Sequence, residues 1–134
     1  MNESDFWAKI KAKCPNGVRV EDSIGSGFPD CELPTEHGWQ HVELKTATRL
    51  EIAVQKSQLA WLAKTYRMGQ LYMPHYMIGF QDDFVMVLRG ITILEGEKRP
   101  IAGKKYVMVD LPSNPMTQLC DHFDKNGIYK WKFA

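Results

Sequence analysis

Cysteine, long hydrophobic runs and net charge are all scarce in this sequence, and each shortage excludes a class of protein. The cysteines at positions 14, 31 and 120 are odd in number and widely spaced, which fits neither a disulfide framework nor a CxxC zinc motif. We therefore expect reduced thiols. No apolar stretch is long enough to cross a membrane, and the first residues (MNESD) include acidic side chains where a signal peptide carries basic ones. These absences predict an intracellular, cytoplasmic protein.

The charge balance is close to neutral, with 17 Lys and Arg against 16 Asp and Glu and a formal net charge of +1. Nucleic-acid binders usually carry a basic footprint, so a surface of that kind in this chain must be local. The chain has 134 residues, of which 44% are hydrophobic and 25% are charged. This size and composition are typical of one globular domain with a substantial core, and we expect a single domain over residues 1–134.

Periodicity along the chain predicts helices interspersed with strands. Apolar residues at helical spacing predict helices at residues 3–13, 55–68 and 116–125, and Ser57 is a candidate N-cap of the second. Alternating polarity predicts strands at residues 18–22, 30–33, 39–45, 71–80, 84–88 and 106–111. Pro74 indicates that its strand begins late or lies at an edge. Segment 46–54 is ambiguous, and segment 91–95 fits either a strand or a helical turn.

The stretch from Gly25 to Lys45 (GSGFPDCELPTEHGWQHVELK) reads as strand, turn, strand. It places a Pro-Asp step upstream of a Glu-x-Lys triplet, with turn-forming residues between them. A turn centred on residues 36 and 37 would place Asp30 directly opposite Glu43. Their Cβ atoms would then be about 4.5–5.5 Å apart. The hairpin therefore predicts two converging carboxylates.

The second strand of this hairpin puts its polar residues on one face. Because side chains alternate along a strand, Lys45 shares the face of Glu43. Val42 and Leu44 then point to the opposite, apolar side, and Cys31 of the first strand lies on the buried face as well. The pattern predicts an acidic and basic site on one side of the sheet and core on the other.

A pair of carboxylates at this distance is stable only with a proton or a cation between them. Oxygen ligands suit Mg²⁺ or Mn²⁺, which keep several waters and need only one or two protein carboxylates. A neighbouring lysine can orient or, as the neutral amine, deprotonate a water, and its ammonium can stabilise charge on a phosphate. Asp30, Glu43 and Lys45 therefore predict metal-assisted phosphodiester hydrolysis, with Mg²⁺ as cofactor and Mn²⁺ as its substitute.

Three sequence elements resemble the PD-(D/E)XK nuclease superfamily over about residues 3–88: Gly27-Phe28-Pro29-Asp30, Val42-Glu43-Leu44-Lys45 and the helix with Gln58-x-x-Trp61-Leu62. The resemblance implies an α/β restriction-endonuclease-like core, in which a central mixed sheet is flanked by helices. It implies Asp30 and Glu43 as metal ligands, with the backbone carbonyl of Leu44 completing the metal shell. Lys45 would be the catalytic partner.

Within the superfamily the sequence is most similar to archaeal-type Holliday junction resolvases and to small virus-type replication-repair nucleases. The resolvase pattern implies a catalytic role for Glu3 on the first helix and nucleic-acid contacts for Arg19 and Ser26. The virus-type pattern implies Gln58 as a catalytic-site residue that caps or buttresses the site. Glu21 competes with Glu3 for the place of a third carboxylate.

A basic segment at residues 96–105 (GEKRPIAGKK) is the candidate phosphate-binding surface. The residues we expect to contact nucleic acid there are Lys98, Arg99, Lys104 and Lys105. The tail offers a second basic group, Lys130 and Lys132 around Trp131, whose ring would stack on an exposed base. A solvated loop and tail remain the alternative reading of both segments.

The expected function is that of a Mg²⁺-dependent, structure-selective DNA endonuclease, a Holliday junction resolvase that acts on branched DNA in phage or cellular recombination and repair. Symmetric cleavage of a junction needs two active sites, so the expected assembly is a homodimer, without a membrane partner. The expected location is the cytoplasm of a bacterium or a phage-infected cell. The alternatives are a flap- or end-processing virus-type nuclease, and a non-catalytic nucleic-acid-binding module on the same fold.

Overall fold

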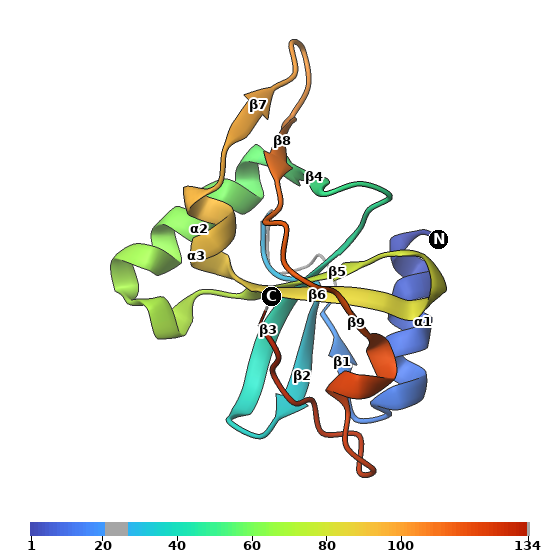
Figure 1. Ribbon diagram of the computed structural model, residues 1–134. Helices are drawn as coiled ribbons and strands as arrows, with labels where there is room; N and C mark the ends of the chain where they lie inside the picture. The colour runs from blue at the N-terminus through green and yellow to red at the C-terminus, as the bar shows by residue number, and fades with distance from the viewer. Residues whose placement is uncertain (21–26, 134) are drawn as a thin grey trace.

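The computed structural model describes residues 1–20 and 27–133, and within these ranges it contains two β-sheets and three α-helices (Figure 1). The helices are α1 (Glu3–Lys13), α2 (Lys56–Met68) and α3 (Gly90–Glu95). The first sheet has the order β1-β2-β3-β5-β6-β9. Its strands are β1 (Val18–Arg19), β2 (Cys31–Thr35), β3 (Gly38–Thr46), β5 (His75–Gly79), β6 (Phe84–Arg89) and β9 (Thr117–Gln118). The second sheet, in the order β4-β8-β7, consists of β4 (Glu51–Gln55), β8 (Tyr106–Asp110) and β7 (Lys98–Pro100).

The first sheet is mixed because β3 and β5 run parallel, whereas its other neighbouring strands are antiparallel. The chain returns from β3 to β5 through β4 and α2, since parallel neighbours need a long crossover. Helix α1 lies on one side of this sheet, and α2 and α3 lie on the other (Figure 1). The predicted fold class, a mixed sheet flanked by helices, is confirmed. No helix in the described ranges is long and apolar enough to span a bilayer.

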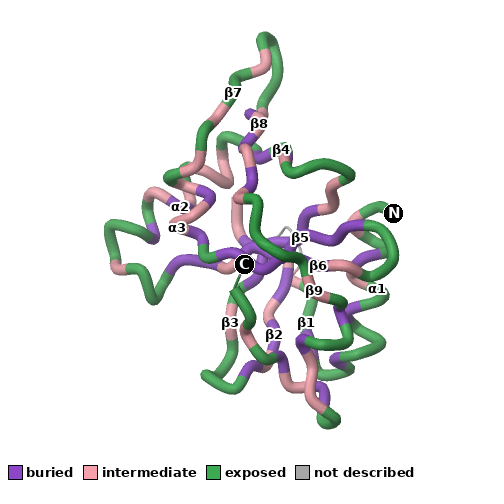
Figure 2. The backbone as a smooth tube through the Cα atoms, viewed as in Figure 1, coloured by how far each residue is buried: buried purple, intermediate pink, exposed green. Residues whose placement is uncertain are grey.

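The two faces of β5 and β6 line two separate cores, which lie in the buried centre of the molecule (Figure 2). One core joins Phe6 and Ile10 of α1 to Leu44 and Met77. The other joins Leu62 of α2 to the second sheet and to the opposite face of β5, through Ile52, Val54, Tyr76, Ile78, Val107 and Val109. Burying a side chain of this size is worth about 1.5–3 kcal/mol. The second sheet is therefore packed firmly against the α2 side of the molecule.

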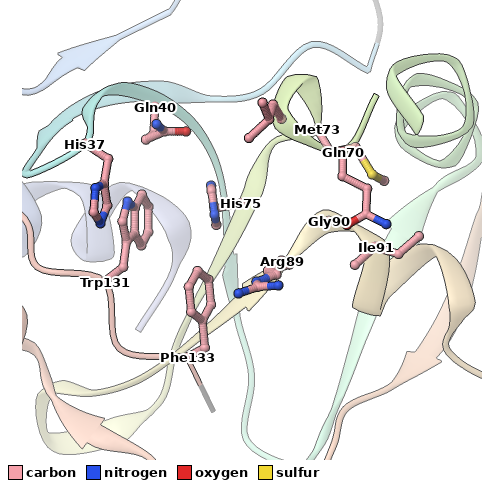
Figure 3. A pocket seen from close by; sticks show the side chains of 11 residues that line it. His37, Gln40, Gln70, Met73, His75, Arg89, Gly90, Ile91, Trp131 and Phe133 are labelled. Carbon is pink, nitrogen blue, oxygen red and sulfur yellow. The ribbon is translucent and has the colours of Figure 1, made fainter. Parts of the chain in front are cut away.

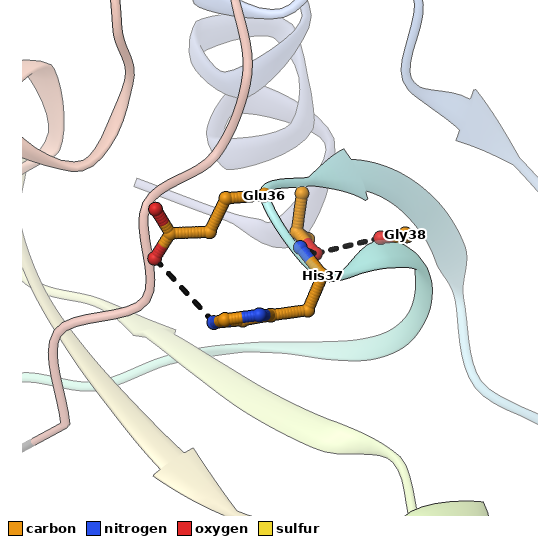
Figure 4. A network of polar contacts seen from close by, with 4 residues as sticks. Glu36, His37 and Gly38 are labelled. Carbon is orange, nitrogen blue, oxygen red and sulfur yellow. Dashed lines mark hydrogen bonds and ion pairs between the residues drawn. The ribbon is translucent and has the colours of Figure 1, made fainter.

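The β2–β3 hairpin has the predicted register. Cys31 pairs with Val42 and Thr35 with Gly38, so the turn is centred on residues 36 and 37. The Thr35 hydroxyl donates to the carbonyl of Gly38 at 2.6 Å and accepts from the backbone N–H of His37 at 3.1 Å (Figure 4). Gly38 has a φ of +95°, which favours glycine at the end of the turn. The turn chemistry thus fixes which residues face each other near the site.

Helices α1 and α2 match the predictions closely. Helix α1 has the predicted bounds, and α2 begins at residue 56 instead of 55. Ser57 is not the N-cap of α2, because Gln55 occupies that position and its backbone N–H donates to Gln58 Oε1 at 2.9 Å. Ser57 lies in the first turn instead, where its hydroxyl donates to Gln55 Oε1.

The segments left open in the sequence have defined structures. Strand β5 begins at His75, directly after Pro74, as that proline predicted. Residues 51–55 of the ambiguous stretch form β4, and residues 90–95 form helix α3. The basic segment is only partly a loop, because residues 98–100 form β7.

The helix predicted at residues 116–125 is wrong. Residues 117 and 118 form β9, which pairs with β6, and a 3₁₀ turn follows at Leu119–His122. Leu119 is buried in the core that contains Phe6 and Ile10 of α1. Pairing to an available sheet edge and burial of Leu119 therefore outweigh the local helical preference of this segment.

Candidate active site

Asp30 and β3 meet where the β2–β3 ladder ends. Pairing stops at Cys31 and Val42, so the backbone N–H of Leu44 has no β2 partner and donates instead to Asp30 Oδ2 at 3.0 Å. The N–H and C=O of one strand residue point to the same edge, so the Leu44 carbonyl also faces the Asp30 side. The predicted register placed Asp30 opposite Glu43, and the structure brings the Asp30 carboxylate against the backbone of the next residue, Leu44.

Glu43 is a buried carboxylate with one oxygen unpaired. Its side chain is 3% exposed, Oε1 accepts a hydrogen bond from Gln58 Nε2 at 2.8 Å, and Oε2 has no partner among the described residues. Burial raises the pKa of Glu43 to about 9, and the neighbouring Asp30 carboxylate contributes to the rise. A carboxyl group in this position holds a proton at neutral pH unless a cation replaces it.

Lys45 lies on the same face of β3, and Gln58 connects it to Glu43. Its ammonium is almost buried, and Nζ donates to Gln58 Oε1 at 2.9 Å. That oxygen also accepts from the Gln55 backbone, while the amide nitrogen of Gln58 donates to Glu43. This amide orientation satisfies all three contacts at once. The first turn of α2 therefore fixes the positions of Glu43 and Lys45 together.

Glu3 is placed beside this group by the start of α1. Its carboxyl is half-buried, and burial raises its pKa, although the charges of Lys45 and Arg19 oppose the rise. The first turn of the helix is held by a capping box in which the Asn2 side chain accepts from the backbone N–H of Asp5 at 2.8 Å. Arg19, exposed on β1, pairs across from Cys31, next to Asp30. Both residues therefore border the predicted carboxylates.

A cavity of about 250 Å³ opens over Lys45, and it is lined by Glu3, Lys45, Thr46, Ala53, Gln55 and Tyr106. Three of these residues, Ala53, Gln55 and Tyr106, come from the second sheet. Sequence reasoning missed them because they carry no motif and lie up to about 60 residues from the hairpin. Tyr106 borders the site only because β8 pairs with β4, which no local pattern reveals.

The predicted phosphate-binding residues are dispersed. Lys98 donates to the backbone carbonyls of Leu94 and Gly96 at the end of α3, and Arg99 forms ion pairs with Glu51 and Asp110. Lys104 and Lys105 are exposed in the turn between β7 and β8, which projects from the molecule (Figure 1). Ser26 and Glu21 lie outside the described residues.

The C-terminal tail borders a different cavity, of about 440 Å³ (Figure 3). The Trp131 ring stacks on His75 at a centroid distance of 4.2 Å, and the Arg89 guanidinium lies over Phe133. Burial, followed by the charge of Arg89, lowers the pKa of His75 to about 4. The lining of this cavity shares no residue with that of the Lys45 cavity. The tail aromatics are therefore engaged in packing away from the carboxylates.

The donor set fits a divalent cation that needs few protein ligands. Within residues 1–20 and 27–133 there is no cluster of three or more His, Cys, Asp or Glu side chains arranged to hold a metal. Asp30 and Glu43 provide two carboxylates, and the buried, unpaired Glu43 Oε2 is a ligand atom without a protein partner among these residues. Mg²⁺ is commonly held by one or two carboxylates together with waters.

Comparisons with known proteins show a shared fold. No protein-family model matches the sequence, and no curated protein matches it. Among solved structures, the chain is similar to Hjc of Archaeoglobus fulgidus, a Holliday junction resolvase from an archaeal hyperthermophile. The TM-score is 0.52 at 12% sequence identity, and the match covers 81% of this chain and 83% of that one. The chain therefore shares the restriction-endonuclease-like fold of this structure.

Proposed function

We propose that this chain is a Mg²⁺-dependent, structure-selective DNA endonuclease that hydrolyses phosphodiester bonds in branched DNA, and that its substrate is a Holliday junction. The observation that carries the proposal is the buried Glu43 carboxylate, one oxygen of which has no partner among residues 1–20 and 27–133. This carboxylate adjoins Asp30 and is connected to Lys45 through Gln58. The fold similarity to a resolvase supports the same class of reaction.

The electrostatics of the carboxylates favour a cation. Two carboxylates in contact, one of them buried, cannot both be ionised without a compensating positive charge. Asp30, Glu43 and the carbonyl of Leu44 would hold Mg²⁺ or Mn²⁺. When bound, the metal would supply a Lewis acid and a water of lowered pKa.

Lys45 and its neighbours would act on the phosphate and the water. The Lys45 ammonium, fixed by Gln58, would orient the attacking water or stabilise negative charge on the phosphate as it develops. A fixed donor is more effective than a mobile one because it needs no reorganisation during the reaction. Glu3, at the edge of the cavity, would position a second water or the substrate strand.

The assembly proposed is a homodimer, because the symmetric cleavage of a four-way junction needs two active sites. A flap- or end-processing nuclease is the second candidate. The near-neutral charge favours it, since a large duplex surface is usually bound through many basic contacts. The two candidates share the same catalytic residues and differ in the DNA that they bind.

A nuclease panel tests the proposal directly. Four-way junction, 5′ flap, single-stranded and duplex DNA are incubated with the protein in Mg²⁺ or Mn²⁺, beside Glu43→Ala and beside Glu36→Ala as a control. Glu36 is an exposed glutamate in the same hairpin, at its turn. We expect cleavage of a branched substrate by the wild type and by Glu36→Ala, and none by Glu43→Ala. Full cleavage by Glu43→Ala, or none by the wild type on any substrate, would overturn the proposal.

A further inference from the structure

We propose that the outward face of the second sheet is one wall of the DNA-binding groove, and that the ring of Tyr106 stacks there on an unpaired base beside the cleaved bond. This inference rests on the proposed nuclease function and specifies its substrate: DNA in which the nucleotide next to the scissile phosphate is unstacked. Tyr106 is assigned as a substrate-positioning residue.

The register of the second sheet determines which side chains face the site. Tyr106 pairs with Gln55 and Met108 with Ala53, so these four share one face. The alternate residues Ile52, Val54, Val107 and Val109 are buried in the core on the other face. The Tyr106 face is thus the outward one, and Gln55, Ala53 and Tyr106 line the cavity that also contains Lys45 and Glu3.

This cavity continues into a longer groove. A neighbouring cavity of about 480 Å³ shares Thr46 and Ala53 with it, and extends past Met108 to the exposed loop residue Arg49. One wall of the groove comes from the end of β3, the loop that follows it, the end of β5 at residues 79–81 and the N-terminal residues Met1 and Glu3, and the other comes from the second sheet. A DNA strand in this groove would pass over Lys45 with Tyr106 at its side.

On the wall formed by the second sheet, the charges favour stacking of a base over attraction of the DNA phosphate backbone. Arg99 lies opposite Met108 on the Tyr106 face, but it is paired with both Glu51 and Asp110. These three side chains together carry a net negative charge, so the wall does not attract phosphates. Arg49 forms no ion pair within the described ranges. An aromatic ring beside an uncharged or acidic wall is suited to a base, whereas Arg49 at the far end is suited to a phosphate.

A base can stack on Tyr106 only if its face is free. In an intact duplex both faces of every internal base are covered by neighbouring bases, and extruding one costs a few kcal/mol. The cost is smallest where the base is already unpaired, as in a flap or a single-stranded end. A stacking residue next to the catalytic group therefore favours the second candidate substrate, a flap or an end with an unpaired nucleotide at the cleaved bond, over a fully paired four-way junction.

The test measures binding and stacking separately from cleavage. The full chain with Lys45→Ala is mixed in Mg²⁺ with a 5′-flap DNA that carries 2-aminopurine at the first unpaired nucleotide, and both affinity and fluorescence are followed. We expect binding to quench the fluorescence. Tyr106→Leu keeps a bulky apolar side chain in β8, and we expect it to remove the quenching and to weaken binding about tenfold. Tyr106→Phe should retain both, since the ring and not the hydroxyl makes the contact.

Tyr72→Leu is the matched control, because Tyr72 is an exposed tyrosine outside the groove lining. We expect it to leave affinity and quenching unchanged. The inference would be overturned if Tyr106→Leu left both quenching and affinity unaltered. It would also be overturned if this variant had an equal effect on a blunt duplex with internal 2-aminopurine. If the wild-type protein cleaves no DNA but still quenches the fluorescence in a way that depends on Tyr106, the inference stands. Only the proposed nuclease function is then overturned.

Discussion

The Lys45 ammonium donates a hydrogen bond to Gln58 Oε1 at 2.9 Å, and this contact joins the second half of the β2–β3 hairpin to the first turn of α2. The same amide donates to Glu43, so one side chain of α2 fixes both the Lys45 ammonium and the proposed metal ligand. The contact joins β3, whose Leu44 packs in the core beside α1, to α2, whose Leu62 packs in the other core. It predicts that activity is sensitive to a residue that contacts no substrate.

Gln58→Ala should lower kcat about 10- to 100-fold on the cleaved substrate, because Lys45 and Glu43 lose the partner that orients them. KM should change much less, since Gln58 lies beneath the cavity lining and not in it. Steady-state kinetics in Mg²⁺ measure both constants. Gln118→Ala, at an exposed glutamine of β9, is the control and should retain wild-type rates. A kcat for Gln58→Ala within twofold of the wild type would contradict the positioning role.

The metal-free protein should lose stability as the pH rises. The pKa of Glu43 is raised to about 9 in the folded state, against 4.5 for the ordinary carboxyl, so the folded state holds one more proton than the unfolded state between these values. The free energy of unfolding therefore falls with increasing pH across this window. Thermal melts in EDTA from pH 5 to pH 9 measure the fall.

Glu43→Gln provides the comparison for these melts, because its amide carries no titratable proton. Its Tm should depend less on pH than that of the wild type over the same range. Addition of Mg²⁺ should stabilise the wild type most at high pH, where no proton competes for the carboxylate. Parallel Tm curves for the two proteins would show that Glu43 is already ionised in the metal-free fold.

Mg²⁺ binding should release close to one proton at pH 7, because the cation replaces the proton on Glu43. Calorimetric titrations in two buffers with different ionisation enthalpies give the number released. Asp30→Asn should weaken Mg²⁺ binding by about tenfold or more, and Asp83→Asn, at an exposed aspartate outside the hairpin, should not. Binding without proton release would argue that the metal occupies another site.

Much of the site was predictable because its signals are local. The register of the hairpin follows from the turn residues near Glu36 and from alternating polarity, and these place Asp30 beside the Glu43-Leu44-Lys45 triplet. The two long helices follow from apolar spacing and good helix formers. Physical interactions within about 20 residues of one another leave a readable pattern in the sequence.

The parts that could not be predicted depend on contacts between distant segments. Tyr106 reaches the cavity because β8 pairs with β4, about 50 residues earlier. Residues 117–118 become a strand because β6 offers an edge. Arg99 looked like a free cation in the sequence, yet it is neutralised by Glu51 and Asp110 from two other segments. No local pattern carries the information on such partners.

The two halves of the basic segment should behave differently in DNA binding. Lys104 and Lys105 are exposed in the β7–β8 turn, so their double substitution by Ala should weaken DNA binding. It should also make the negative slope of log K against log salt shallower by about 1 to 2. Lys98→Ala should instead lower Tm, because the Lys98 ammonium satisfies the carbonyls of Leu94 and Gly96. Filter binding at several salt concentrations and thermal melts distinguish the effects. A salt slope reduced by Lys98→Ala and unchanged by the double variant would place the phosphate contact on β7 and not on the turn.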